Sequence, residues 1–344
     1  MEEKKEKKTR TKRSKMPSLI KYGALDKTVV KKPQKDYAPM LEGPATNKLD
    51  MAHSRQLTFE DISNEAIIEN NGLTITFTKY KELKGLRPST QKLFDMGVLE
   101  LTKVNNFKED KNINTEIKFS LKDYAGLLGN DMEIRLIDDP EKQKKEKKRV
   151  QKIIDKVRTK VNEDLEVLYD MSLDWEEEIK GKQGDYKKVR ILQDFSLERG
   201  IVTMNFSEKI ARYLNTSYIT QYPKKLLTLD ERVPLVIQLG RKLASHYWIT
   251  NNQKRGSNNK IQVKTLIKGI GSLLSFEEVQ KTDPGHWERR IREPLENALD
   301  ILERKGILKS WELCNSKGTP LTNKQVEAND YKTYSECYIK FELK

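Results

Sequence analysis

Four lysines near the middle of the chain are spaced so that a helix would carry them on one side. At about 100° per residue, Lys145, Lys148, Lys152 and Lys156 lie opposite Val150 and the other apolar residues of the same stretch. Those other apolar residues are Ile153, Ile154, Val157, Val161, Leu165 and Leu168. Ammonium groups in such a row can bind the phosphates of a nucleic acid. A solvated face on a charged helix explains the same pattern equally well.

The charges of this helix are also ordered from one end to the other. The lysines precede Glu163, Asp164 and Glu166, which reverses the order that the helix macrodipole favours. Because the bases come first, only the N-terminal half of the helix could approach phosphates.

Three arginines begin a second apolar helix near the C-terminus. Its inward face consists of Trp287, Ile291, Leu295, Ala298 and Leu302. This face leaves Arg289 and Arg292 outward and Arg290 at the flank, where guanidinium groups can bind guanine edges or phosphates. The alternative is that Arg289 and Arg292 form i to i+4 surface pairs with Glu293 and Glu296. We favour binding because both helices place their bases first.

Weaker candidates lie on neighbouring elements, where they could contact phosphates or simply be solvated. These are Lys187, Lys188, Lys264, Thr265, Lys268 and Lys317. Position alone does not separate the two interpretations.

The sequence offers no catalytic apparatus. No Gly-x-x-x-x-Gly-Lys-[Ser/Thr] run occurs to cradle a nucleoside triphosphate. The three histidines, His53, His246 and His286, are isolated, so no His-x-His pair exists to hold the metal of a DNA-nicking enzyme. Cys314 and Cys337 form no zinc motif. We therefore expect no enzyme activity, no cofactor and no metal.

Composition points to a polyanionic partner. Lys and Arg outnumber Asp and Glu by 66 to 52, which gives a formal charge of +14 and a pI near 9.4. No apolar run approaches the roughly 20 residues of a membrane span, and the charged N-terminus offers no secretion signal. The expectation is a cytoplasmic, DNA-associated protein.

The element order predicts two similar units of mixed helix and strand. The first contains a helix from about residue 87, a strand at 115–120 and a short helix opened by Ser120 and closed by Gly129. The long basic helix follows from about Pro140, and a β-hairpin forms around residues 181–184. In the second unit the same order recurs, with a helix at 229–247, a strand at 261–263, and helices at 264–270 and 285–305, the last interrupted at Pro294. Strands at 307–314 and 334–343 then flank a long wing.

This order is typical of the winged helix, in which the second long helix lies in the major groove and the hairpin flanks it. The predicted class is α+β, with two tandem winged-helix domains after a disordered basic tail. The expected boundaries are 1–57 for tail and linker, 58–200 for the first domain and 201–344 for the second.

Three segments of the sequence resemble the initiator replication proteins of theta-replicating plasmids. They are the strand and helix of residues 201–214, the aromatic stretch 218–222 with the helix to Tyr247, and the arginine-rich 287–295. The resemblance covers roughly residues 60 to 344. It implies binding of double-stranded DNA at repeated origin sites, local opening of the origin, and recruitment of a replicative helicase or its loader. It also implies self-repression as a homodimer.

Two other functions fit the same residues. A transcriptional repressor or copy-number regulator of a mobile element would use the same surfaces without starting replication. A nicking enzyme would cleave or covalently hold DNA in the presence of a divalent metal. Direct repeats near the gene, spaced by one or two helical turns, would favour the initiator.

Overall fold

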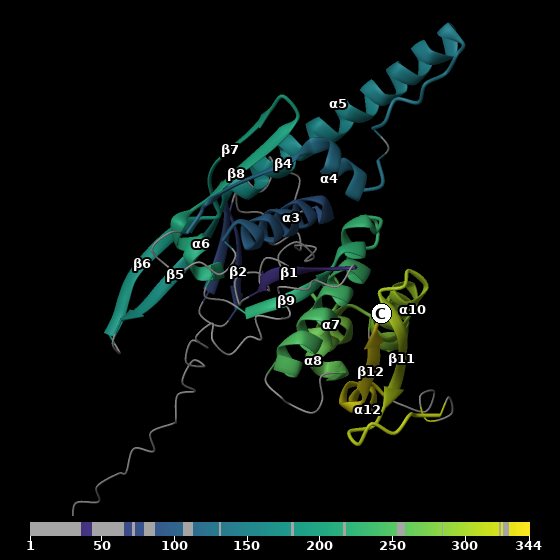
Figure 1. Cartoon of the computed structure of the whole chain (residues 1–344). Helices are drawn as coiled ribbons and strands as arrows, with labels where there is room; N and C mark the ends of the chain where they lie inside the picture. Colours follow the sequence, from purple (N-terminus) through teal and green to yellow (C-terminus); the bar gives the residue numbers. More distant parts are fainter. Residues whose placement is uncertain are drawn as a thin grey trace, which may run out of the picture.

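The fold mixes helices with small antiparallel sheets, and the predicted α+β class is confirmed (Figure 1). The structure is a computed structural model. It describes residues 36–42, 65–70, 73–78, 87–105, 113–130, 132–179, 182–215, 218–252, 259–283, 285–322, 325 and 330–344. Within these ranges, no helix has the length and apolar character needed to cross a membrane. The predicted basic tail lies outside the described residues.

The first unit combines three helices with a three-stranded sheet. In chain order its elements are α3 (Pro88–Asn105), β4 (Glu116–Ser120), α4 (Leu121–Leu127), α5 (Pro140–Asp170), β7 (Leu192–Glu198) and β8 (Ile201–Phe206). The last strand is central and pairs antiparallel with both β4 and β7. The predicted cap of the short helix is confirmed, because the Ser120 hydroxyl accepts from the amides of Lys122 and Asp123.

The second unit repeats this order. Its elements are α7 (Pro234–Asn252), β10 (Lys260–Gln262), α8 (Val263–Lys268), α9 (Phe276–Thr282), η4 (Glu288–Arg292), α10 (Glu293–Arg304), β11 (Leu308–Cys314), α12 (Tyr331–Glu336) and β12 (Tyr338–Leu343). Here too the last strand is central and antiparallel to its neighbours.

One backbone hydrogen bond is equivalent in the two units. The amide of Leu121, the first residue of α4, donates to the carbonyl of Gly200, just before β8, at 2.8 Å. The amide of Val263, the first residue of α8, donates to the carbonyl of Cys337, just before β12, at 2.9 Å. In both units the first amide of the short helix, which has no partner within the helix, donates to the residue just before the last strand. This hydrogen bond fixes the last strand against the short helix.

The hairpin around residues 181–184 does not complete the first unit's sheet, so that prediction is wrong. Its strands are β5 (Met171–Ile179) and β6 (Lys182–Arg190), and they join β2 (Glu65–Asn70) and β3 (Leu73–Thr78) in a separate four-stranded sheet. The hairpin of the unit is β7–β8 instead. The predicted domain boundary at residue 200 therefore falls between two paired strands.

A two-stranded ribbon links the start of the described chain to the second half. Strand β1 (Tyr37–Glu42) pairs antiparallel with β9 (Tyr218–Pro223), although the sequence assigns residues up to 57 to tail and linker. The amide of Leu41 donates to the Thr102 hydroxyl of α3, and the Tyr37 hydroxyl donates to the carbonyl of Lys344. The ribbon thus contacts the first unit and the C-terminus of the second. Helix α6 (Glu208–Asn215) and the 3-10 turn η3 (Lys224–Thr228) flank β9 in the chain.

The buried apolar residues form one continuous core across both units. Helix α5 contributes Val157, Val161, Leu165 and Leu168 of its predicted stripe to this core. Val150 is buried outside it, and Ile153 and Ile154 are half-buried. The predicted interruption at Pro294 is confirmed by a π-helical turn over Glu288–Arg292. Proline has no amide hydrogen for the regular helical bond to Arg290, which favours the wider turn at this position.

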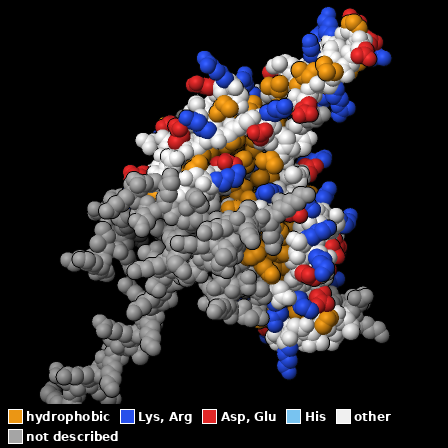
Figure 2. Space-filling view, viewed as in Figure 1, with side chains coloured by type: hydrophobic (Ala, Val, Ile, Leu, Met, Phe, Trp, Pro, Cys, Tyr) orange, Lys and Arg blue, Asp and Glu red, His pale blue; other side chains and the backbone are white. Residues whose placement is uncertain are grey.

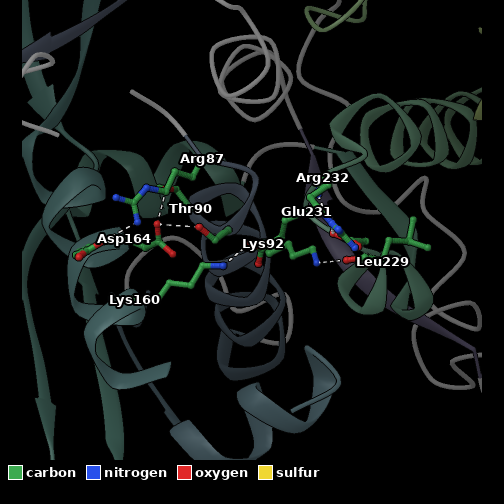
Figure 3. Close-up of polar contacts among 11 residues, drawn as sticks. Arg87, Thr90, Lys92, Lys160, Asp164, Leu229, Glu231 and Arg232 are labelled. Atoms are coloured by element: carbon green, nitrogen blue, oxygen red, sulfur yellow. Dashed lines mark hydrogen bonds and ion pairs between the residues drawn. The ribbon is translucent and has the colours of Figure 1, made fainter. Parts of the chain in front are cut away.

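Polar contacts join the two units where α3 meets α7. Asp95 and Arg241 form an ion pair whose side chains are 0% and 2% exposed, and the Tyr222 hydroxyl donates to Asp95 at 3.0 Å. Nearby, the Lys92 ammonium donates to the carbonyl of Leu229, and Lys160 pairs with Glu231 (Figure 3). These contacts fix the orientation of the units to each other.

Asp164 of α5 is a buried carboxyl group at the start of α3. It accepts hydrogen bonds from Ser89 at 3.1 Å and from Thr90 at 2.7 Å (Figure 3). Burial raises the pKa of Asp164 to about 6, against the opposing effect of these two hydrogen bonds. The sequence analysis grouped Asp164 with Glu163 and Glu166 in the acidic half of the helix, and the structure shows that Asp164 is buried.

Candidate nucleic-acid interface

The N-terminal half of α5 projects from the body of the protein and is strongly basic (Figure 1). Residues 140–160 contain three acidic side chains, Glu141, Glu146 and Asp155. They contain ten basic ones: Lys142, Lys144, Lys145, Lys147, Lys148, Arg149, Lys152, Lys156, Arg158 and Lys160. Figure 2 shows Lys and Arg side chains along this projecting end. The helix begins at Pro140, and the Asp139 carboxylate caps its first amides.

The four predicted lysines of α5 share one open face. Lys145, Lys148, Lys152 and Lys156 are all exposed, and none has an ion pair with another described residue. The segment before the helix covers a different face, because the amide of Ile137 donates to the Gln143 side chain at 2.7 Å. The lysine face is therefore accessible to a large ligand.

The turn of the β7–β8 hairpin lies beside α5 in the turns that follow Lys156. The turn and the helix line a surface groove of about 710 Å³ whose helical wall includes Arg158, Thr159 and Asn162. At about 100° per residue these three lie roughly 80–180° from Val150, partly overlapping the lysines. Glu163, Glu166 and Glu198 also line the groove and make this part of the surface acidic. A polyanion on this face would thus be confined to the lysine-rich half.

Arg199 at the tip of the hairpin is a candidate that the sequence analysis missed. It is exposed, and its φ of 49° makes it the one non-glycine residue with positive φ among the described residues. Gly200 follows with a φ of 78°, so the pair has the dihedral signs of a type I′ turn. Arginine is an unusual residue here, since Asn and Gly fit this conformation better. An arginine in this unfavourable backbone conformation suggests that its side chain has a function.

In the second unit the three predicted arginines differ in their surroundings. Arg289 is exposed and has no ion pair among the described residues. Arg290 is exposed but pairs with Asp283 at 2.9 Å, and this contact lowers the pKa of Asp283. The Arg292 side chain is only 16% exposed and pairs with Glu288 at 2.8 Å. Arg289 is therefore the arginine most available to a ligand.

An aromatic cluster holds this helix start in place. Trp287 packs edge-on against Tyr331, which stacks on Phe276 with ring centroids 3.7 Å apart. Trp287 also contacts Tyr334, and the Arg292 guanidinium lies 5.9 Å from the Trp287 ring. Arg292 is thus largely enclosed and packs against the aromatic cluster.

The remaining predicted residues are spread over three elements. Lys264, Thr265 and Lys268 are exposed on α8, opposite the buried Val263, Leu266 and Ile267. Lys317 is exposed in the turn after β11. Lys187 and Lys188 lie in β6, within the separate four-stranded sheet, and their side chains are outside the described part of the structure.

Within the described ranges, no group of three or more His, Cys, Asp or Glu side chains could hold a metal ion. Both cysteines are buried as free thiols. The candidate interface, as far as the structure describes it, thus consists of cationic side chains.

No family model matches the chain, and no curated protein matches it. Among solved structures the chain is similar to a protein described as "Crystal structure of Pi initiator protein in complex with iteron DNA". The two are 12% identical, the similarity covers 80% of this chain and 99% of that chain, and the TM-score is 0.47.

Proposed function

We propose that the chain is a sequence-specific double-stranded DNA-binding protein built from two winged-helix units, and that it acts as a plasmid replication initiator. One observation carries the DNA-binding part of this proposal. Arg199, at the tip of the hairpin that completes the unit, lines a groove with Arg158 and Thr159 of α5, in the turns that directly follow the open lysine face. A winged helix presents its recognition helix and its wing to DNA in this relationship.

The second unit supports the proposal by its repeated topology. Its last strand is central as in the first unit, and Arg289 is open at the start of the equivalent helix. Two reading helices in a fixed orientation would select two DNA segments at a fixed spacing. Direct repeats at an origin provide such a target. Binding, without cleavage of DNA, is then the whole of the chemistry, and the protein acts in the cytoplasm.

A selection from random duplex DNA tests the binding. The full chain is incubated with a random pool, and bound molecules are sequenced. The expected result is an enriched site with two conserved blocks about one helical turn apart. Arg289→Ala should relax the sequence preference in one block, at a cost of about 1–3 kcal/mol for a lost base contact. Recovery of unselected sequence would reject the proposal.

A plasmid assay separates the initiator from the repressor. The gene and its selected site are placed on a DNA circle that has no other origin. Autonomous replication supports an initiator, which would recruit a replicative helicase or its loader. Control of a promoter without replication supports the transcriptional repressor or copy-number regulator.

A further inference from the structure

A cavity of about 430 Å³ lies between the two units, close to the contacts in Figure 3. Its walls come from α3, α4 and α5 on one side and from residues 228–231 and Lys305 on the other.

The acidic groups of the cavity are already engaged. Asp230 pairs with Arg232, and Glu231 pairs with Lys160. Asp164 accepts from the hydroxyl groups of Ser89 and Thr90. The carboxylates therefore have cationic or hydroxyl partners of their own.

Three cations of the cavity have no such partner. Lys92, Lys156 and Lys305 line the cavity, and none of them pairs with a carboxylate among the described residues. Lys156 and Lys305 are exposed at its rim, one on each unit. The side chains around the cavity thus leave an excess of positive charge that spans the junction.

Hydrogen-bond donors in the cavity also lack acceptors. The Lys92 side chain is 2% exposed, and its ammonium donates to the carbonyl of Leu229, which uses one of its three hydrogens. Tyr124 is 1% exposed, and its hydroxyl has no hydrogen-bond partner among the described residues. A buried donor without an acceptor is costly, so these two groups favour an acceptor in the cavity.

We propose that this cavity binds a phosphate group, supplied either by the backbone of a bound duplex or by a small phosphate-bearing molecule. A phosphate offers several acceptor oxygens to the Lys92 ammonium and the Tyr124 hydroxyl. Its negative charge offsets the unpaired lysines. A group bound there bridges α5 of the first unit and the end of α10 in the second. The proposal stands on the cavity itself and does not depend on the proposed function.

Calorimetric titration with inorganic phosphate, at constant ionic strength, tests the site in the full chain. Saturable binding is expected. Tyr124→Phe removes one hydroxyl and should weaken binding about two- to tenfold, the range for one hydrogen bond. Lys305→Ala should weaken it further. Lys281→Ala, an exposed lysine on α9, is the matched control and should leave the affinity unchanged.

Competition with DNA identifies the source of the phosphate. If the duplex supplies the phosphate, inorganic phosphate should no longer bind to the DNA complex. Lys305→Ala should then reduce the slope of log affinity against log salt concentration by the amount expected for about one phosphate contact. If a small molecule supplies it, the titration persists on the DNA complex. The proposal is overturned if no saturable phosphate binding occurs and DNA affinity is the same in the wild type, Tyr124→Phe and Lys305→Ala. The cavity would then hold water only.

Discussion

Asp95 of α3 and Arg241 of α7 form an ion pair that is buried from solvent at the contact between the two units. Asp95 also accepts from Tyr222, so its second carboxylate oxygen is satisfied. A buried pair of this kind contributes little net stability over an apolar pair, but loss of one partner leaves an uncompensated charge.

Asp95→Asn should therefore lower the free energy of unfolding by about 3–5 kcal/mol. Urea denaturation of the full chain measures this. Arg232→Ala serves as the control, because it breaks an ion pair in which the arginine side chain is 89% exposed, and its stability should stay close to that of the wild type. Equal effects of the two variants would contradict a structural role for the buried pair.

Stability should fall as the pH rises from about 4 to about 7 because of Asp164. Its folded pKa of about 6 lies above the ordinary value of 3.8, so the folded state holds this proton more tightly. This tighter proton binding adds roughly 3 kcal/mol to the free energy of unfolding. The added stability is fully present below about pH 4 and is lost as the pH rises through 6.

Asp164→Asn keeps an acceptor for Ser89 and Thr90 but does not titrate. The variant should lack this component of the pH dependence and should be more stable than the wild type at pH 7.5. Unfolding curves at several pH values check this. Asp155→Asn, an exposed change on the same helix, should retain the wild-type profile.

Arg199→Asn should weaken DNA binding without loss of stability. Asparagine fits the positive φ of the turn better than arginine, while the cationic group is removed. Affinity and its salt dependence should both fall, since a phosphate or groove contact is lost. Arg199→Lys retains the charge and should bind more tightly than the Asn variant. If both variants match the wild type in binding, the hairpin tip does not contact DNA.

Gly240→Ala should destabilise the second unit. A Cβ there would lie 2.6 Å from Leu226 and 2.8 Å from Leu302, so a packed side chain must move. We expect a loss of about 1–3 kcal/mol. Gly126→Ala is the matched control, because its Cβ meets nothing within 4 Å in helix α4 and the change should be neutral or stabilising. Thermal unfolding of both variants makes the comparison.

Local patterns were sufficient for the elements that depend on neighbouring residues. The Ser120 cap, the stripe from Val150 to Leu168 and the interruption at Pro294 each follow from side chains within a few turns of one another, and the structure contains all three. Strand pairing depends on distant segments. The turn signal near residues 181–184 marked a real hairpin, but the pairing of β4 with β8 could not be read from it.

The same limit affected the candidate site. Arg199 was overlooked because its hairpin was divided between two predicted domains. Arg292 was predicted to contact DNA because its angle on the helical wheel points outward. The side chain is enclosed instead, next to the π-helical turn and Trp287, which the helical periodicity does not reveal. The burial of Asp164 likewise depends on a distant segment, because the hydroxyl groups that enclose it come from the start of α3.

The pairing of β1 with β9 imposes an order on biosynthesis. Tyr37 leaves the ribosome long before its partner Pro223 exists, and at 5–20 residues per second the interval is on the order of ten seconds or more. During that time Met40 and Leu41, both fully enclosed in the finished protein, have no strand to pair with. The nascent chain therefore presents an open strand edge to chaperones, or to a second nascent copy, until the second half of the protein has been made.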